Sequence, residues 1–330
     1  MIIAKFFKPL LSAMFGALLL VAALPAAAQD NFPGKPIKWI VPYPPGGIPD
    51  RLARAYAIRL AQAWGQPVVV ENKPGANSLI GGKALAEEPA DGYTMLMITS
   101  VVAVGRALYP ASSWPAHPLN VFAPVSSMIK LSNVVVVPAD SPYKSMADLI
   151  AASKAAREPV QYGIPSLGSS VHLGMEVFAE RSAMKVTGVP FKGGPDLATN
   201  LVGGHIGLAA DNLTNSLPHI RSGKLRALMV MSPQRNGVIP DVPSSTDIGY
   251  GDFESSSWQG VAEKVGTPKS IVDKISREIV RISKLPEVRK QFEEQGDILV
   301  SSTPEEFAAL IRHEASTMTA VIKRLNLTSQ

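Results

Sequence analysis

The chain alternates short apolar runs rich in β-branched residues with longer stretches whose apolar residues recur every three or four positions. The longer stretches predict helices, as in the faces Leu52/Tyr56/Leu60 and Val171/Met175/Phe178 and the shorter pair Leu197/Leu201. Alternation of strands and helices predicts an α/β fold with mostly parallel sheets covered by helices. The short runs predict strands at residues 37–41, 68–70, 94–99, 133–137, 186–191, 206–210 and 225–232.

The last quarter of the chain predicts three amphipathic helices that pack for structural reasons. Thr267 and Pro268 are typical of a helix cap and first helical residue, and Gly296 is typical of a helix end. Thr303 followed three residues later by Glu306 forms a capping box. The predicted buried face of the first of these helices comprises Val272, Ile275, Ile279 and Ile282.

The first 28 residues predict export. Lys5 and Lys8 precede an apolar run, and Ala26 to Ala28 supply the small residues that a signal peptidase recognises. The run from residue 9 to 24 is shorter than the roughly 20 residues that span a bilayer. We therefore expect a signal peptide over residues 1–28, cleavage after Ala28 and a periplasmic location, although a retained membrane anchor is the alternative.

Composition limits the classes of function. Without Lys5 and Lys8 the chain keeps 30 basic and 27 acidic side chains, a net charge of about +3, which is too small and scattered for a nucleic-acid partner. The sequence contains no cysteine, which excludes disulfides, thiolate metal ligands and cysteine nucleophiles. Its five histidines share no metal-ligand spacing, so we expect neither a metal nor a cofactor.

Glycine-rich loops precede several predicted helices, at residues 41–47, 72–77, 162–170 and 191–196. Unpaired N–H groups and the helix dipole make such helix starts favourable for anions. In open α/β sheets these loops lie at the carboxyl ends of strands, where ligands bind. The same residues also suit ordinary strand-to-helix turns, but four loops of one kind favour a receptor for a carboxylate.

Enzyme motifs are weak in this sequence. It lacks a Gly-x-Ser-x-Gly elbow, a dinucleotide fingerprint and a phosphate-binding loop. Ser169 and His172 could form a hydrogen bond, although a cap serine beside a packed histidine is the more ordinary arrangement. Asp211 could contact a ligand or cap a helix, and Trp258 could line a cleft or belong to the core.

These motifs, taken together, are similar to those of the Bug family of periplasmic receptors, the substrate-binding components of tripartite tricarboxylate transporters. The matching segments follow one another in family order over essentially all of the chain after residue 28. They are residues 39–47, 66–76, 91–94, 191–194, 211–213, 217–220, 223–228, 240–243 and 303–307.

The resemblance implies a two-lobed clamshell like other periplasmic binding proteins, with the ligand between the lobes. The first lobe would comprise residues 29–130 and 250–330 and the second residues 131–249, with crossings near 125–131 and 250–258. Loop backbone groups would bind a small organic acid. The ligand-binding residues carried over are Tyr43, Gly46, Gly47, Ile48, Ser100, Ser166, Ser169, Ser170, Gly193, Gly194 and Asp211.

The resemblance also implies membrane permease subunits as partners and no catalysis, and we expect a monomer. Ile48 and Pro49 depart from the small polar pair expected there, because Ile48 adds apolar bulk and Pro49 lacks an N–H donor. This departure favours a bulkier or less polar acid than a small dicarboxylate. Two alternatives remain: a ligand sensor for a membrane signalling partner, and a secreted α/β hydrolase with Ser166 or Ser169 as nucleophile.

Overall fold

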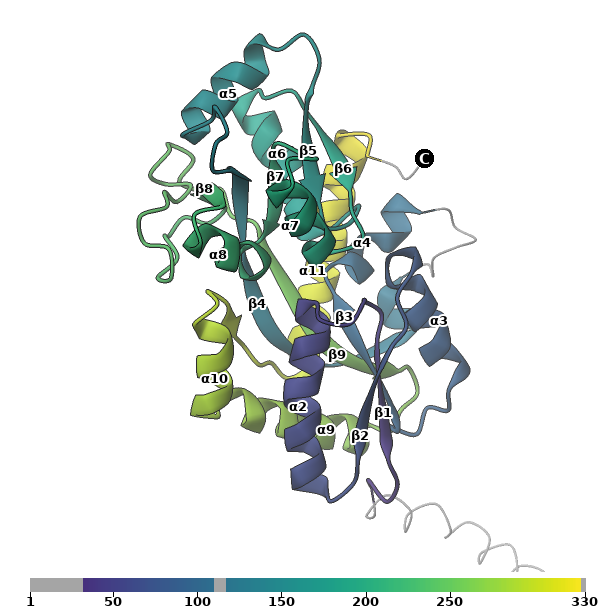
Figure 1. Cartoon of the computed structure of the whole chain (residues 1–330). Helices are drawn as coiled ribbons and strands as arrows, with labels where there is room; N and C mark the ends of the chain where they lie inside the picture. The colour runs from purple at the N-terminus through teal and green to yellow at the C-terminus, as the bar shows by residue number, and fades with distance from the viewer. Residues whose placement is uncertain (1–31, 110–116, 328–330) are drawn as a thin grey trace, which may run out of the picture.

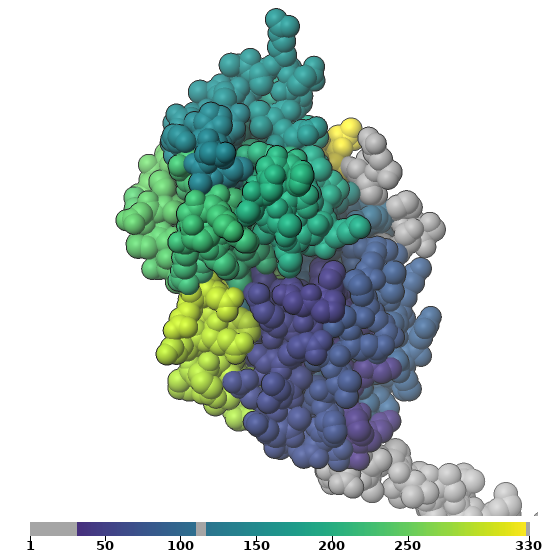
Figure 2. All heavy atoms as spheres, viewed as in Figure 1, coloured from purple at the N-terminus to yellow at the C-terminus, as the bar shows by residue number. Residues whose placement is uncertain are grey.

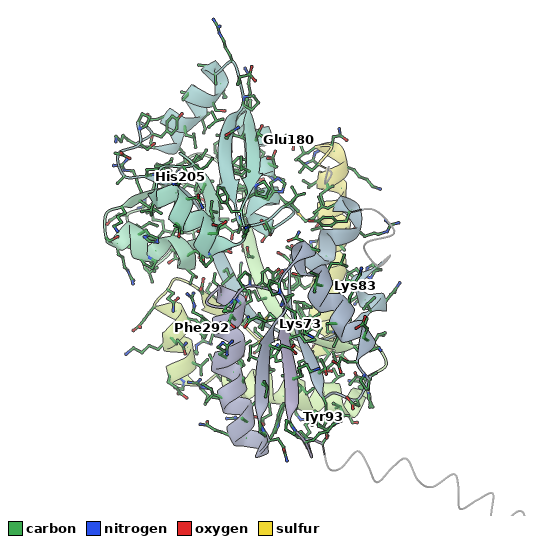
Figure 3. The ribbon with its side chains drawn as sticks, turned by 45° about the vertical axis from the view of Figure 1, so that its right-hand side comes forward. Lys73, Lys83, Tyr93, Glu180, His205 and Phe292 are labelled. Carbon is green, nitrogen blue, oxygen red and sulfur yellow. The ribbon has the colours of Figure 1, made fainter. Side chains whose placement is uncertain are left out.

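The computed structural model describes residues 32–109 and 117–327 and shows two lobes that share one continuous mixed sheet (Figure 1). The strand order is β2-β1-β3-β9-β4-β7-β5-β6, with β8 and β10 also paired to β4. Figure 3 places Tyr93 and Phe292 in the lower lobe and Glu180 and His205 in the upper lobe. The strands are β1 Ile37–Val41, β2 Val68–Asn72, β3 Thr94–Thr99, β4 Phe122–Pro138, β5 Val160–Ile164, β6 Val186–Pro190, β7 Ala209–Asn212, β8 Leu225–Val230, β9 Ser256–Lys264 and β10 Ile298–Leu299.

Helices cover both lobes. In the lower lobe, α2 and α9 pack with the sheet around buried Trp39, Tyr56 and Phe292. In the upper lobe, buried Phe178 packs with Tyr162 in a second core. The helices are α2 Ile48–Trp64, α3 Leu79–Glu87, α4 Val101–Leu108, α5 Met146–Ala155, α6 Ser170–Ser182, α7 Gly194–Val202, α8 Leu213–Arg221, α9 Lys269–Ser283, α10 Pro286–Glu293 and α11 Pro304–Arg324.

Strands β4 and β9 connect the two lobes. β4 is 17 residues long and pairs antiparallel with β9 from Phe122 to Ser132. From Asn133 onward, β4 pairs instead with β7 and β8 of the upper lobe. Since β1 pairs parallel with β2 and β3, and β5 parallel with β6 and β7, each lobe adds a parallel sheet to this antiparallel spine.

The C-terminal helix α11 also contacts both lobes. Its predicted capping box is present, because the Thr303 hydroxyl accepts from the Glu306 N–H and the Glu306 carboxylate accepts from the Thr303 N–H. The helix packs against α4 and β4 and then against α6 of the upper lobe. Near its end, Arg324 forms a two-bonded ion pair with Glu180 of α6 at 2.9 and 3.1 Å.

Most of the predicted elements are present, with informative differences. The strand predicted at residues 206–210 runs instead from Ala209 to Asn212. Pro268, predicted as the first residue of a helix, is its cap, so α9 begins one residue later. The strand that leads into the loop at residues 162–170 is β5, whereas the polar strand β9 was missed, because its burial does not follow a simple apolar run.

The described residues include no helix with the length and apolar character needed to span a bilayer. Residues 1–28 lie outside the described residues, so the export signal stays a prediction.

We predict that Gly260→Ala lowers the free energy of unfolding by about 1–3 kcal/mol, the usual cost of overpacking. Gly260 lies in β9 between β3 and β4, and a Cβ there would come within 2.6 Å of the Ser126 carbonyl oxygen while also meeting the Phe307 ring. Urea unfolding measures the change. Gly207→Ala is the control, because a Cβ there meets nothing within 4 Å, and equal stability of the two variants would contradict the prediction.

Candidate functional site: a pocket at converging helix starts

A pocket of about 340 Å³ lies where residues of both lobes meet. Figure 2 shows the lobes in contact on this face, with green upper-lobe residues directly above purple residues near the start of α2. The volume suits a small-molecule ligand. The lining comprises Tyr43, Pro44, Pro45, Gly47, Ile48, Pro49, Thr99, Ser100, Val101, Leu131, Pro165, Ser166, Ser169, Ser170, Val171, Lys192, Gly193, Gly194, Pro195, Asp196, Asn212, Asn215, Ser257, Trp258 and Gln259.

Five helices of the described chain begin at the pocket wall. Their cap residues all line the pocket: Gly47 of α2, Ser100 of α4, Ser169 of α6, Gly193 of α7 and Asn212 of α8. Ser169 is the one among them whose side chain accepts a capping bond, from the His172 N–H. The other four starts have no side-chain cap, so their first N–H groups are left for another acceptor.

Few charged side chains reach the pocket. Among the described lining residues, Lys192 carries the one positive charge and Asp196 the one negative charge. The Asp196 carboxylate is already used, since it accepts from the Lys192 N–H at 2.9 Å and from Asn200 at 3.2 Å. Apart from Lys192, the positive potential at this wall therefore comes from helix starts, and no guanidinium is among the described lining residues.

A hydrogen-bonded network joins the helix starts to the spine. The Ser170 hydroxyl lies 3.3 Å from the Ser100 hydroxyl of the lower lobe and 2.5 Å from the Ser257 hydroxyl of β9. Ser257 donates to the Asn133 side-chain oxygen at 3.0 Å, and Asn212 donates to both Asn133 and Ser257. The network therefore fixes the starts of α4, α6 and α8 relative to one another.

Asp211 lies behind the wall of the pocket. Its side chain is buried, and its carboxylate accepts from the Asn212 N–H, the Asn215 amide and the Ser216 hydroxyl at 2.8–2.9 Å. Burial raises the pKa of Asp211 to about 6, although these three hydrogen bonds act in the opposite direction. Asp211 thus orients Asn212 and Asn215, which do line the pocket.

The structure brings together nine of the eleven residues predicted from the sequence. Gly46 and Asp211 do not line the pocket. Gly46 adopts φ +84°, and its N–H donates to Asp50, so it forms the turn that presents Gly47. The nine that line the pocket are Tyr43, Gly47, Ile48, Ser100, Ser166, Ser169, Ser170, Gly193 and Gly194.

The glycine-rich loop at residues 72–77 lies outside the pocket, unlike the other three glycine-rich loops. It leads into a short 3₁₀ turn before α3 and does not line the pocket. Instead, the Asn77 amide donates to the Leu167 carbonyl of the upper lobe at 2.8 Å and to the Tyr109 hydroxyl at 2.9 Å. This loop therefore connects the lobes beside the pocket.

Sequence reasoning missed five polar lining residues that lie outside the four glycine-rich loops. Asn212 is the cap of α8 and Asn215 lies in its first turn, so treating residue 212 as a cap would have found both. Ser257 and Gln259 alternate on β9, and Thr99 lies opposite Gln259 on β3. No signal marked Ser257 or Gln259, because β9 was not expected as a strand, whereas the position of Thr99 at the carboxyl end of the predicted strand 94–99 could have indicated it.

Trp258 both lines the pocket and packs in the core, the two positions considered from the sequence. It lines the pocket, and its ring packs edge-on against Phe307 at 5.2 Å between centroids. Its indole N–H donates to Glu314 of α11, a partner that also supports the pocket wall from behind. Trp258 is therefore a residue of the pocket wall whose position is fixed by core contacts.

The serine and histidine at the start of α6 are not arranged as a nucleophile and base. The Ser169 hydroxyl donates to the Ser166 carbonyl, and the His172 Nδ1 atom accepts from the Gly168 N–H at 3.0 Å. The His172 Nε2 atom lies 3.9 Å from a Glu176 oxygen. Burial lowers the pKa of His172 to about 4, so this ring is neutral near pH 7.

The described residues also contain no group of three or more His, Cys, Asp or Glu side chains that could bind a metal ion.

Comparison with protein families settles the relationship of the chain. Residues 52–327 match the model of the tripartite tricarboxylate transporter family receptor. The chain belongs to this receptor family. It is 35% identical to the protein BugT of Bordetella pertussis over 316 residues, which cover 95% of this chain and 96% of BugT.

Solved structures of similar receptors have the same fold. Rpa4515 of R. palustris, solved with adipate, is 28% identical, with a TM-score of 0.84 over 89% of this chain and 98% of that one. MatC of Rhodopseudomonas palustris, solved with bound malate, is 25% identical, with a TM-score of 0.79 over 88% of this chain and all of that one. The two-lobed α/β fold of the receptor is therefore shown by both sequence and structure.

A buried carboxylate bridges the lobes of this receptor away from the pocket. Asp297 follows α10 of the lower lobe and accepts a hydrogen bond from the Thr214 hydroxyl of α8 in the upper lobe. Its second oxygen, Oδ1, is buried without a hydrogen-bond partner in the described chain. Burial raises the pKa of Asp297 to about 7, and the Thr214 bond and the charge of Arg51 offset the effect only in part.

We predict that Asp297→Asn flattens the dependence of stability on pH. The pKa of Asp297 is about 7 in the folded state, against an ordinary value of 3.8 for the unfolded chain. Between these pH values the native state holds more protons, so stability falls as pH rises. The loss from this one group between pH 5 and pH 7 is roughly 2 kcal/mol. Urea unfolding at both pH values measures this change in the free energy of unfolding, and the exposed Asp140→Asn variant is the control. If Asp297→Asn showed the same dependence of stability on pH as the wild type, Asp297 would not be the titrating group.

Proposed function

We propose that the protein is a periplasmic receptor that captures a small organic acid for a tripartite tricarboxylate-type transporter. The observation that carries this proposal is the convergence of five helix starts, four of them without a side-chain cap, on one pocket. The similar receptors solved with adipate and with malate support a carboxylate as ligand.

We propose that the lobes move about two crossings of the spine. The change of β4 partner at Ser132/Asn133 supports one crossing, and the start of β9 at Ser256 supports the other. Residues 29–130 and 250–330 would then form one lobe and residues 131–249 the other, each boundary lying within a few residues of these crossings. Closure would be favoured by ligand because only the closed state completes both walls.

The two walls would share the ligand. Gly47, Ile48 and Ser100 of the lower lobe and the segments 166–170 and 193–194 of the upper lobe would surround it, with main-chain N–H groups holding the carboxylate. Pro49 supplies no N–H, and Ile48 lies buried at the pocket wall. We therefore propose an acid with an apolar body, not a small, fully polar diacid.

The proposed partners are inner-membrane permease subunits that recognise the closed, monomeric receptor. A sensor that signals to a membrane kinase would use the same binding chemistry, and pull-down from solubilised inner membrane distinguishes the two by the partner recovered. The hydrolase alternative would require a serine activated by a base, whereas His172 accepts from the Gly168 N–H and not from a serine.

Calorimetry against a panel of straight-chain acids tests the proposal. The panel runs from acetate to octanoate and includes the matching hydroxy acids and diacids. We expect saturable binding of one acid per protein, with the acid recovered unchanged. Covalent labelling of Ser166 or Ser169 by a serine-directed inhibitor would favour the hydrolase, and the absence of binding by every acid would overturn the proposal.

We predict that Gly47→Val weakens binding of the tightest acid by at least tenfold with little change in melting temperature. Gly47 has φ −69°, and a Cβ there meets no atom closer than 3.6 Å, so the fold tolerates it while the branched side chain occupies the pocket wall. Titration calorimetry and thermal melting measure the two effects. Gly237→Val, in an exposed loop with open space, is the control; unchanged affinity in Gly47→Val would make this loop only a turn.

A further inference from the structure

Gln259 is a buried amide with unused hydrogen-bonding capacity at the pocket. Its side chain is 5% exposed and lines the pocket. The side-chain oxygen is buried without any hydrogen-bond partner in the described chain. Buried amides in native proteins are normally paired, so an unpaired one at a binding pocket needs a physical reason.

The polar neighbours of Gln259 are already occupied. Ser257 lies two residues earlier on the same face of β9, and its hydroxyl is bonded to Asn133, Asn212 and Ser170, which exhausts one donor and two acceptors. Thr99 lies opposite Gln259 on β3 and bonds the Tyr43 hydroxyl at 2.7 Å. Gln259 is therefore the side chain on this sheet face with most capacity left for a ligand.

The position of Gln259 differs from that of the helix starts. It lies in the middle of a strand of the lower lobe, between β3 and β4, and no helix begins at it. Apolar Leu131 lies opposite Ser257 on β4 and also lines the pocket, as do Ile48 and Val171. A ligand that reaches Gln259 thus has an apolar body and a polar group away from its anchored carboxylate.

The lack of charge around Gln259 limits which polar group of a ligand can bind there. Gln259 is neutral, and the one cationic lining side chain, Lys192, lies on the β6–α7 loop of the upper lobe. A second carboxylate would lose its hydration against a single neutral amide, which is unfavourable. A neutral hydroxyl can donate to the unpaired Gln259 oxygen, whereas a carbonyl oxygen is only an acceptor and cannot pair with it.

We infer that Gln259 is a specificity-determining residue whose side-chain oxygen accepts a hydrogen bond from a hydroxyl on the chain of the captured acid. This inference rests on the proposed function, and it narrows the ligand to acids that carry a hydroxyl beyond the carboxylate. The apolar lining contacts the carbon chain between the two polar ends.

Affinities of matched acids test the inference. For each chain length from butanoate to octanoate, calorimetry compares the unsubstituted acid, the ω-hydroxy acid, an oxo acid and the diacid. We expect the wild-type protein to bind the best hydroxy acid about tenfold more tightly than the unsubstituted acid or the oxo acid of equal length, as one added hydrogen bond allows. In Gln259→Met, which keeps the length of the side chain, the ratio between the hydroxy acid and the unsubstituted acid should fall to within about twofold.

Controls separate the possible failures. Gln161→Leu removes an exposed glutamine of β5 and should keep the wild-type ratio. If Gln259→Met does not fold, Gln259→Leu is measured in its place, with circular dichroism confirming the fold. The inference alone is overturned if the ratio persists in the folded variant, or if the wild type prefers the unsubstituted acid, the oxo acid or the diacid. Failure of every acid to bind the wild type overturns the proposed function as well.

Discussion

The antiparallel pairing of β4 with β9 is the constraint on which the rest of the structure depends. These two strands run from one lobe towards the other, and every other strand of the described chain is added, directly or through a neighbour, to their edges. Because parallel sheets on either side of this spine place the carboxyl ends of their strands towards the junction of the lobes, the following helices begin there. The pocket is a result of this topology more than of any single residue.

Recognition by helix starts has a different character from recognition by arginine. Main-chain N–H groups are fixed by the helices that carry them, so they lose little conformational entropy when a ligand binds. Their partial charges attract an anion without placing a full positive charge in the pocket. In the proposed function, discrimination between acids would therefore depend on the shape of the wall, to which apolar Ile48 contributes, and on the unpaired side-chain oxygen of Gln259.

The sequence predicts the fold class and most of the pocket because those features depend on local signals. Glycines before helices and caps such as Thr303 leave patterns within a few residues of one another. Strand β9 leaves none, since polar Gln259 and Glu263 are buried there by neighbours more than 100 residues away. For the same reason the role of Asp211 behind Asn212 and Asn215 emerges only when α8 is folded against β7.

Asp211 also gives the pocket a thermodynamic property that its shape alone does not reveal. The carboxyl lies directly behind Asn212 and Asn215, and burial raises its pKa to about 6. If the proposed carboxylate binds in front of these two residues, its negative charge would favour the protonated form of Asp211. By reciprocity, protonation of Asp211 would strengthen binding of the anion to the same degree. Capture of the proposed acid would then be coupled to uptake of a proton, and the heat of binding would include the ionisation enthalpy of the buffer.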